Sequence, residues 1–336
     1  MHNKFKTYWI LLLSLLFIAT SCIDEDLSDC PSGLSVGFTY NLYNQDMEYA
    51  NAFENAVNNI TLMVFDAEGN FVEQHIATNE DLKYNGYRID VCCLPNGSYQ
   101  LLAWGGIMGD TFVSEELVKG QSQLADVLVK LNTIKNGASD EDLAPLFYGR
   151  TALLNYKNTK HTKVEVPLIK NTNTFRVLLQ DVNNQEVKPE VFSFQIIDKN
   201  IGLDHENERA IDLEVTYKAF AQGNLAVETR QGGEGDPVNT VVYAELSTSK
   251  LFANHSEKAR LRILNNESNQ EVLNIPLIDM VLLMKNQKFS KSITNQNYLD
   301  RIHNFNMTFF LNNGSWMSTQ IIVNGWTLRF NDIEDL

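Results

Sequence analysis

The first residue with distinctive chemistry is Cys22, which follows an N-terminus typical of secretion. A basic stretch comes first, then an apolar run over residues 8–18, then three small residues at 19–21. The apolar run is too short to span a bilayer comfortably, so we expect residues 1–21 to be a cleaved signal peptide. A thiol directly after small residues suits attachment of a diacylglycerol, and we predict that Cys22 is lipidated. An ordinary secretory signal followed by an incidental cysteine is the alternative.

Three further thiols, those of Cys30, Cys92 and Cys93, would then lie in an oxidising compartment. A disulfide could join Cys30 to Cys92 or to Cys93 and leave one thiol over. Adjacent residues of a strand point to opposite faces, so only one of the neighbouring pair could face Cys30. Three buried free thiols are the alternative.

Residue patterns that would indicate catalysis or metal binding do not occur in the sequence. There is no His-Glu-x-x-His, Gly-x-Ser-x-Gly or Cys-x-x-Cys pattern. The acidic run 204–208 lacks the glycine and the terminal glutamate of a calcium loop, so it favours a solvated loop. We therefore expect no catalytic residue, no metal and no cofactor, and a protein that is not an enzyme. A surface hydrolase remains an alternative, because a pair of carboxylates on a β fold leaves no sequence pattern.

The composition indicates an ordinary globular protein with a strong acidic excess. The 336 residues are 44% hydrophobic and 21% charged, which is enough apolar material for real cores. The formal net charge of −15 argues against nucleic acid as a partner, because phosphate contacts need clustered Lys and Arg.

The elements that must position these residues are mainly strands, since alternating apolar and polar residues dominate the chain. We expect a crossover with a short helix over 112–131 and a short helix over 277–284. Turn residues at short spacing favour β-sandwiches over a parallel sheet. The expected parts are a tether over 22–33, an N-terminal sandwich over 34–168 and a C-terminal sandwich over 169–336. The predicted strands are 34–40, 60–65, 71–72, 87–91, 98–104, 162–168, 173–179, 192–197, 238–246, 258–264, 271–275, 307–311 and 321–330.

Several short stretches, in this order, resemble one family, the anchor-subunit lipoproteins of Bacteroidales type V fimbriae. The stretches that carry the likeness are Cys22 with Asp29-Cys30-Pro31, then 95–99 leading to 103–105, 146–149, 166–173 leading to 175–177, 244–249, 275–278, 298–301 and 322–326. The resemblance implies an all-β protein of two transthyretin-like β-sandwich domains with short helical crossovers. It also implies a surface-exposed lipoprotein of the outer membrane, at the base of a fimbrium. The acidic run 23–26 is similar to export signals of such lipoproteins.

The resemblance further implies a partner and a mode of assembly. The partner would be a fimbrial stalk subunit, held by β-strand complementation, and the anchor would limit the length of the fimbrium. A minor or tip component of the fimbrium is one alternative. A surface glycan-binding lipoprotein is another, with Tyr148, Tyr156, Trp316 and Trp326 as candidate contacts.

The N-terminal strand is predicted to remain in place. In stalk subunits of the family, a protease that cuts after arginine removes the first strand. Here the first basic residues after Cys22 are Lys83 and Arg88, and Arg88 lies within a predicted strand. We therefore expect the first strand to be retained, with four apolar side chains on one face: Leu34, Val36, Phe38 and Tyr40.

The C-terminal strand, 321–330, has the apolar alternation that could fill a groove in a neighbouring subunit. Its apolar residues include Val323, Trp326, Leu328 and Phe330. A permanent edge strand of the protein's own sheet is the alternative, and the one that we favour.

Overall fold

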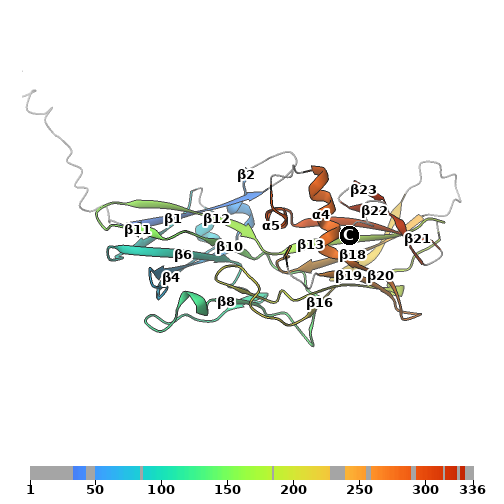
Figure 1. Ribbon diagram of the computed structural model, residues 1–336, viewed down its shortest axis with the longest axis horizontal. Helices are drawn as coiled ribbons and strands as arrows, with labels where there is room; N and C mark the ends of the chain where they lie inside the picture. The colour runs from blue at the N-terminus through green and yellow to red at the C-terminus, as the bar shows by residue number, and fades with distance from the viewer. Residues whose placement is uncertain are drawn as a thin grey trace, which may run out of the picture.

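The computed structural model describes residues 33–42, 50–83, 86–183, 185–227, 239–254, 259–288, 293–312, 315–323 and 326–329. The predicted signal peptide and residues 22–32 of the predicted tether, with Cys22 and Cys30, lie outside the described residues, as does Phe330; Gly33, the last residue of the predicted tether, is the first residue of β1. The described chain is mostly β, and its strands form several sheets that stack along an elongated molecule (Figure 1). The prediction of an all-β fold built from β-sandwiches is confirmed.

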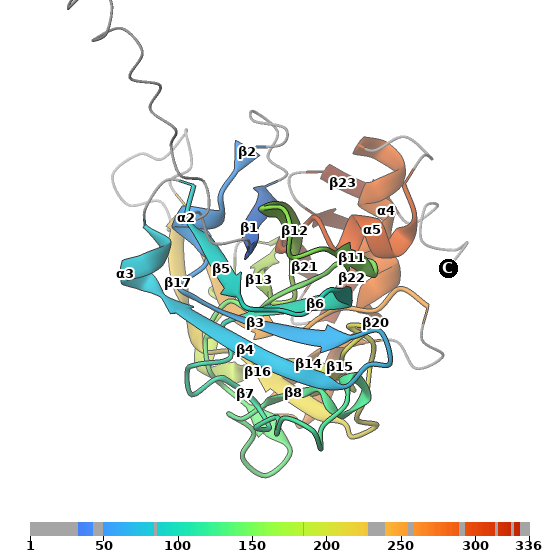
Figure 2. The ribbon, with the colours of Figure 1, turned by 90° about the vertical axis from the view of Figure 1, so that its left-hand side faces the viewer.

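One large sheet forms the first half of the described chain. Its main path runs β2–β1–β12–β10–β6–β3–β4, with β5 beside β1 and β11 beside β6. Seen end-on, this sheet curls so that β3 and β4 come round toward β5, which is paired with β1 (Figure 2). The strands are β1 (Gly33–Leu42), β2 (Ala50–Asn51), β3 (Asn59–Asp66), β4 (Phe71–Thr78), β5 (Arg88–Cys92), β6 (Gly97–Gly105), β10 (Phe147–Arg150), β11 (Leu154–Tyr156) and β12 (Thr162–Lys170). Two single-turn helices, α2 (Phe53–Ala56) and α3 (Asn79–Leu82), join its strands.

The concave face of this sheet encloses an apolar core. Alternate residues of β1, β3 and β6 point into it, because successive strand side chains face opposite sides. The four predicted inward residues of β1 are all buried there: Leu34, Val36, Phe38 and Tyr40. Phe38 stacks on Phe53 of α2 with ring centroids 5.6 Å apart.

The convex face of the same sheet is covered by a small three-stranded sheet. Its strands are β7 (Phe112–Ser114), β8 (Leu128–Leu131) and β15 (Gly202–Asp204), in the order β15–β8–β7. The predicted helical crossover over 112–131 is therefore wrong except for one 3₁₀ turn, η2 (Leu124–Asp126). Phe112, Val129 and Leu131 are buried against Trp104 and Phe65 of the large sheet, and this burial selects strands over a helix.

Two sheets pack face to face in the second half of the chain (Figure 1). Between them lies a core in which Phe175 and Phe305 stack at 5.0 Å. One sheet is β17 (Ala221–Val227), β18 (Asn239–Thr248), β13 (Asn173–Asp181), β21 (Asn304–Asn312), β22 (Ser315–Val323) and β23 (Trp326–Arg329), in that order. The other is β20 (Gln270–Pro276), β19 (Arg260–Asn265), β14 (Phe192–Asp198), β16 (Val215–Lys218) and β9 (Ala138–Ser139). The helical segments are η3 (Pro189–Val191), α4 (Leu277–Lys288), which confirms the helix predicted from Leu277, and α5 (Asn295–Leu299).

Strands cross between the two halves of the chain. β15, from the second half, pairs with β8 of the first, and β9, from the first half, pairs in parallel with β16 of the second. One continuous apolar cluster accordingly contains Trp104 and Phe112 together with Phe175 and Tyr217. The two halves therefore share a core.

In each half the first strand pairs in parallel with a strand from late in that half. The first strand of the first half, β1, runs parallel to its last, β12, from Leu34↔Thr162 to Tyr40↔Leu168. In the second half β13 runs parallel to β21, from Thr174↔Asn304 to Asp181↔Leu311. The two halves thus share one parallel pairing that involves their first strand.

The predicted C-terminal strand 321–330 is wrong as a single element. The structure has a hairpin instead, in which β22 pairs antiparallel with β23, and Val323 lies opposite Trp326. The residues between them in the sequence are Asn324-Gly325, a dipeptide that strongly favours a two-residue hairpin loop. Among the described residues, no helix combines the length and the apolar character needed to cross a membrane.

Candidate functional site

The N-terminal strand β1 is an interior strand, with neighbours on both sides. β12 pairs with one edge, and the other edge pairs with β5 from Gly33↔Cys92 to Gly37↔Arg88 and then with β2 at Asn41 and Leu42. Its inward face is apolar and buried, so removal of β1 would expose that core and leave two strand edges unpaired.

A single arginine also covers the outward face of β1. Arg88, at the start of β5, extends its guanidinium across β1 to β12. It donates to Ser35 Oγ at 3.1 Å, to the Ser35 carbonyl at 2.8 Å and to the Val164 carbonyl at 2.7 Å. It also forms an ion pair with Glu165 of β12. Arg88 therefore ties three adjacent strands together, and we call this group (Arg88, Ser35, Val164 and Glu165) the Arg88 clamp.

The Arg88 clamp depends on a glycine in the middle of β1. A Cβ added at Gly37 would lie 2.5 and 2.8 Å from the two carboxylate oxygens of Glu165, and even closer to Arg88 Nη1. A Cβ there would therefore force the ends of these two side chains to move. Gly37 is thus the open position through which the guanidinium reaches β12.

The backbone at Arg88 is itself part of the sheet. Arg88 lies opposite Gly37 and Ile89 lies opposite Val36, so the peptide bond between Arg88 and Ile89 lies within the β1–β5 ladder. The Ile89 side chain is buried, and the Arg88 side chain is 22% exposed. A protease that cuts after arginine would have to detach β5 from β1 to reach this bond.

The thiols of Cys92 and Cys93 lie at the end of β5 that faces the start of β1. Both are exposed, and Cys93 has a φ of +66°, which ends the regular strand. Cys92 lies opposite Gly33. Cys30, outside the described residues, precedes Gly33 by three positions, a span of at most about 10 Å. The disulfide of Cys30 with either thiol stays a prediction, within reach of the chain.

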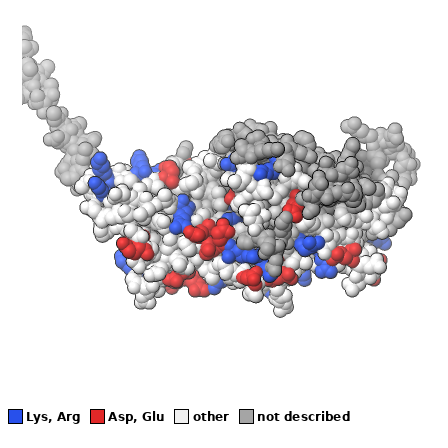
Figure 3. Space-filling view, viewed as in Figure 1, with Lys and Arg blue, Asp and Glu red and all other residues white. Residues whose placement is uncertain are grey.

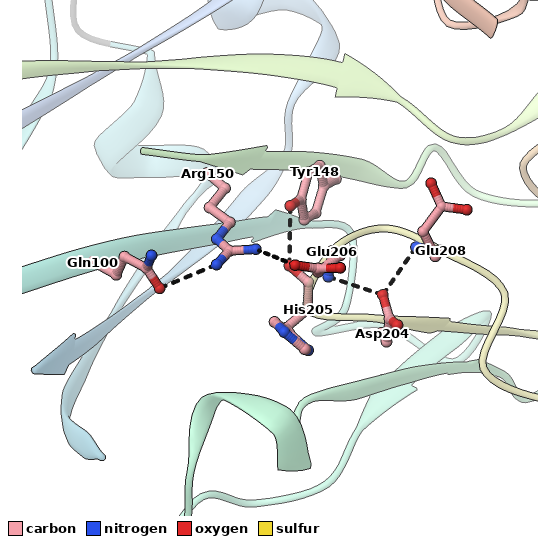
Figure 4. A network of polar contacts seen from close by, with 7 residues as sticks. All are labelled: Gln100, Tyr148, Arg150, Asp204, His205, Glu206 and Glu208. Atoms are coloured by element: carbon pink, nitrogen blue, oxygen red, sulfur yellow. Dashed lines mark hydrogen bonds and ion pairs between the residues drawn. The ribbon is translucent and has the colours of Figure 1, made fainter. Parts of the chain in front are cut away.

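A polar junction joins the first half to the loop after β15 (Figure 4). The Tyr148 hydroxyl donates to the His205 carbonyl at 3.0 Å. Arg150 donates to Gln100 at 3.2 Å and pairs with Glu206 at 3.5 Å. Arg150 thus joins β10 to Gln100 of β6, and Tyr148 and Arg150 connect β10 to residues that lie 57 and 56 positions later in the sequence.

The loop after β15 is held by its own backbone and is partly buried. Asp204 Oδ1 accepts from the backbone N–H groups of Glu206 and Glu208, at 2.8 and 2.9 Å. The prediction of a solvated loop is wrong for Asn207, which is only 2% exposed. Its side-chain amide exchanges two hydrogen bonds with that of Asn171, at 2.6 and 3.2 Å. Lys250 Nζ donates to the Asn207 carbonyl at 2.7 Å.

Burial changes the protonation of ionisable groups near this junction. Desolvation raises the pKa of Asp198 to about 6, against smaller opposing effects of the Lys199 N–H and the charge of Arg209. Desolvation, together with the smaller effect of the Lys170 charge, lowers the pKa of His303 to about 3. At neutral pH, His303 is therefore an uncharged part of the core.

The C-terminal hairpin forms one border of its sheet. β22 pairs with β21, and β23 pairs with β22 on the outside, where Leu328 lies opposite Ile321. Trp316 of β22 packs edge-on against Phe309, with ring centroids 6.5 Å apart. Val323 and Trp326 are thus partners within one hairpin.

The aromatic residues considered for glycan binding serve mainly in packing. Tyr156 is fully buried, and Tyr148 packs against Trp104 at 5.0 Å. Trp316 is partly buried against the core. Tyr148 and Tyr156 lie on the large sheet of the first half and Trp316 on the six-stranded sheet of the second; the Trp326 side chain is not among the described groups.

Surface charge offers no single binding patch on the face seen in Figure 3, where acidic and basic side chains alternate. Within the described ranges, no three His, Cys, Asp or Glu residues are grouped so that they could hold a metal ion.

The sequence pointed to Arg88, but it did not reveal the residues that Arg88 contacts in the sheet. Ser35, Gly37 and Glu165 carry no recognisable pattern, because their relation to Arg88 exists only once β5, β1 and β12 are adjacent. The available signal was the pair of small residues, Ser35 and Gly37, on the outward face of a strand whose other face is wholly apolar.

Comparison with known proteins agrees with this architecture. Residues 27–332 match the family of fimbrillin-A associated anchor proteins Mfa1 and Mfa2. A candidate adhesin from Bacteroides thetaiotaomicron superposes with a TM-score of 0.80 at 33% identity, over 89% of this chain and 98% of that one. A candidate polysaccharide-binding protein from the same species has a TM-score of 0.75 at 28% identity, over 88% and 97%.

The fold is also that of the fimbrial anchor protein Mfa2 from Porphyromonas gingivalis, with a TM-score of 0.67 at 17% identity, over 89% of this chain and 99% of that one. A comparison with curated protein sequences gave no significant match. The expectation of a fimbrial anchor fold is confirmed, and the chain belongs to the fimbrillin-A associated anchor protein family.

Proposed function

We propose that this protein is a lipoprotein of the outer membrane that holds the base of a fimbrium at the cell surface. Membership of the anchor family supports the association with fimbriae. The N-terminal sequence supports the attachment, because it ends in small residues directly before Cys22. Acyl chains on Cys22 would supply membrane affinity at about 0.8 kcal/mol for each buried methylene.

The single observation that carries this proposal is the interior position of β1. A lipid on Cys22 can anchor the protein only while the chain between Cys22 and the fold is intact. β1 is paired on both edges, buried on its inward face and covered by Arg88 on its outward face. The first arginine of the mature chain is Arg88 itself, within the β5 ladder. Retention of β1 therefore accompanies retention of the lipid.

The fimbrial partner would be a stalk subunit, joined by β-strand complementation. An unpaired strand edge offers N–H and C=O groups that a partner's strand can satisfy. Among the described strands of the six-stranded sheet, β17 and β23 are the borders. Because the β22–β23 hairpin extends the protein's own sheet, we propose that it stays with this fold and that the anchor limits fimbrial length by occupying the base position.

The experiment is a comparison of wild-type cells with a Cys22→Ala variant, using Cys93→Ala as the matched control. Wild-type and Cys93→Ala protein should incorporate labelled palmitate, remain in the outer membrane and co-purify with fimbrial subunits. The Cys22→Ala protein should lose the label, and fimbriae should be shed into the medium or grow longer in electron micrographs.

Intact-mass measurement of surface protein tests the retention of β1 in the same cells. The expected N-terminus is Cys22. An N-terminus beyond Tyr40 would contradict retention, and a Cys22→Ala strain with normally attached fimbriae of normal length would contradict the anchor role.

A further inference from the structure

The two parallel strand pairs lie in series along the molecule. β1 and β12 are paired at seven consecutive positions, and β13 and β21 at eight. Both pairs run along the long axis, one in each half (Figure 1). Only Asn171 and Thr172 separate β12 from β13, and both are buried.

The direction of an external pull on β1 and β12 follows from this topology, and it rests on the proposed function. A chain tethered at Cys22 pulls β1 from its Gly33 end. A fimbrium held by the second half pulls β12 from its Lys170 end, in the opposite direction. Because the strands are parallel, the force runs along the ladder and loads all its hydrogen bonds together. Force applied to the same end of both strands would instead break the bonds one after another.

Side chains add resistance to this sliding motion. Four apolar side chains of β1 are packed in the core, and they would have to leave their packed positions for the strand to slide. The Arg88 clamp bonds β5, β1 and β12 near the Gly33 end of the ladder, at Ser35 and Val164. Sliding of β1 by even one residue would break these bonds and would also turn its apolar residues toward the outer face.

We propose that the β1–β12 pair, with the Arg88 clamp, resists tension directed along the long axis of the protein and so keeps the protein folded when it is pulled. The same pair is weak when it is opened from one end. The molecule therefore resists a pull that shears the pair better than a pull that opens it. A chain that is tethered at its N-terminus and pulled through its second half shears the pair.

Single-molecule force spectroscopy of the full mature chain tests this proposal with two attachment geometries. One handle is placed at residue 22 in both. The second handle is a short tag inserted either after Ser268, in the exposed turn between β19 and β20, or after Lys160, in the exposed turn before β12. Exposed turns accept insertions well. A reductant is present throughout, so that no bridge from Cys30 contributes.

The Ser268 handle shears β1 against β12, whereas the Lys160 handle opens the same pair from its Gly33 end. The rupture event is identified by the length of chain that the first half releases. We expect a force at least about twofold higher in the shearing geometry, because its hydrogen bonds break together. Arg88→Ala should lower the force in the shearing geometry, where the bonds of the clamp are loaded together with those of the ladder.

Equal rupture forces in the two geometries would overturn the proposal, and so would an Arg88→Ala protein with an unchanged shearing force. A second variant, Glu165→Gln, removes the ion pair but keeps the hydrogen bonds that Arg88 donates to Ser35 and Val164. It controls for a general loss of stability in Arg88→Ala. It should have an intermediate shearing force. Co-purification of fimbrial subunits, measured separately in cells, shows whether the anchor role itself has failed.

Discussion

Replacement of Gly37 by alanine should destabilise the protein through one specific collision. The new methyl group would occupy the space where the Arg88 guanidinium and the Glu165 carboxylate meet. Gly37 does not have a positive φ, so the backbone itself accepts an L side chain there. The expected cost therefore comes from displacement of Arg88, not from backbone strain.

The size of the effect follows from the bonds that Arg88 would lose. It donates three hydrogen bonds of 2.7 to 3.1 Å to Ser35 and Val164. Bonds to a charged group contribute roughly 1.5–3 kcal/mol each in isolation, but bonds from one group are not additive. The Glu165 partner is 54% exposed, so its ion pair adds at most about 0.5 kcal/mol. We expect both Gly37→Ala and Arg88→Ala to lower the free energy of unfolding by about 2–4 kcal/mol.

A double-mutant cycle isolates the collision. In an Arg88→Ala background the methyl group has room, so adding Gly37→Ala should change stability by less than about 0.5 kcal/mol or increase it slightly. The expected coupling energy is therefore about 2 kcal/mol or more. Gly109→Ala is the matched control, since an added Cβ there meets nothing within 4 Å.

The assay is urea denaturation of the mature chain, followed by tryptophan fluorescence and by far-UV circular dichroism. Coincident transitions from the two probes are required before free energies are compared. If the effects of Gly37→Ala and Arg88→Ala simply add, the two residues act independently and the account of the Arg88 clamp is wrong.

Three further predictions concern the core and the junction. His303, with its pKa lowered to about 3, binds a proton more readily when unfolded, so its contribution to stability is lost as the pH falls from about 6.5 toward 3. Asp198, with its pKa raised to about 6, binds a proton more readily when folded, so its contribution is lost as the pH rises from about 4 to 6. Between about pH 4 and 6, the free energy of unfolding should therefore rise with pH more steeply in Asp198→Asn than in the wild type. In His303→Gln it should rise less steeply than in the wild type. Parallel curves for the three proteins would contradict both pKa assignments. Asn171→Ala removes both amide bonds to Asn207 and should cost about 1–3 kcal/mol in urea denaturation, whereas a cost below about 0.5 kcal/mol would mean that the junction does not contribute to stability. Phe38→Ala opens a cavity beneath β1 and should cost about 3–5 kcal/mol by the same assay, and a much smaller loss would show that β1 is not firmly packed.

The strands themselves could be predicted well from the sequence, because alternation over β1, β3 and β6 directly reflects which face is buried. The partners of those strands could not. The parallel pairing of β1 with β12 joins residues that lie more than 120 positions apart, and no local pattern records it. Arg88 illustrates the consequence: the sequence identified it as a basic residue within a strand, but its contacts with Ser35 and Val164 depend on that long-range pairing.

Two errors of prediction have local physical causes. The segment 112–131 has mixed spacing, and burial against Trp104 decides in favour of short strands. The segment 321–330 has apolar residues on both sides of Asn324-Gly325, and its interpretation as one strand passed over the hairpin signal of that dipeptide. Asn207 shows a third limit. Its acidic neighbours suggest solvent, but a buried amide is acceptable when another amide, that of Asn171, satisfies it.

The shared core explains how the two halves can transmit force without a flexible link. A pull on β12 reaches β13 through Asn171 and Thr172, whose burial and bonding fix their position. Were these two residues the sole connection, the halves would rotate until the link was straight, and the load would no longer follow the strands. The exchanged strands β15 and β9 prevent such rotation, because each is paired with a strand of the other half. The parallel ladders can thus remain aligned with the long axis because the two halves share one core.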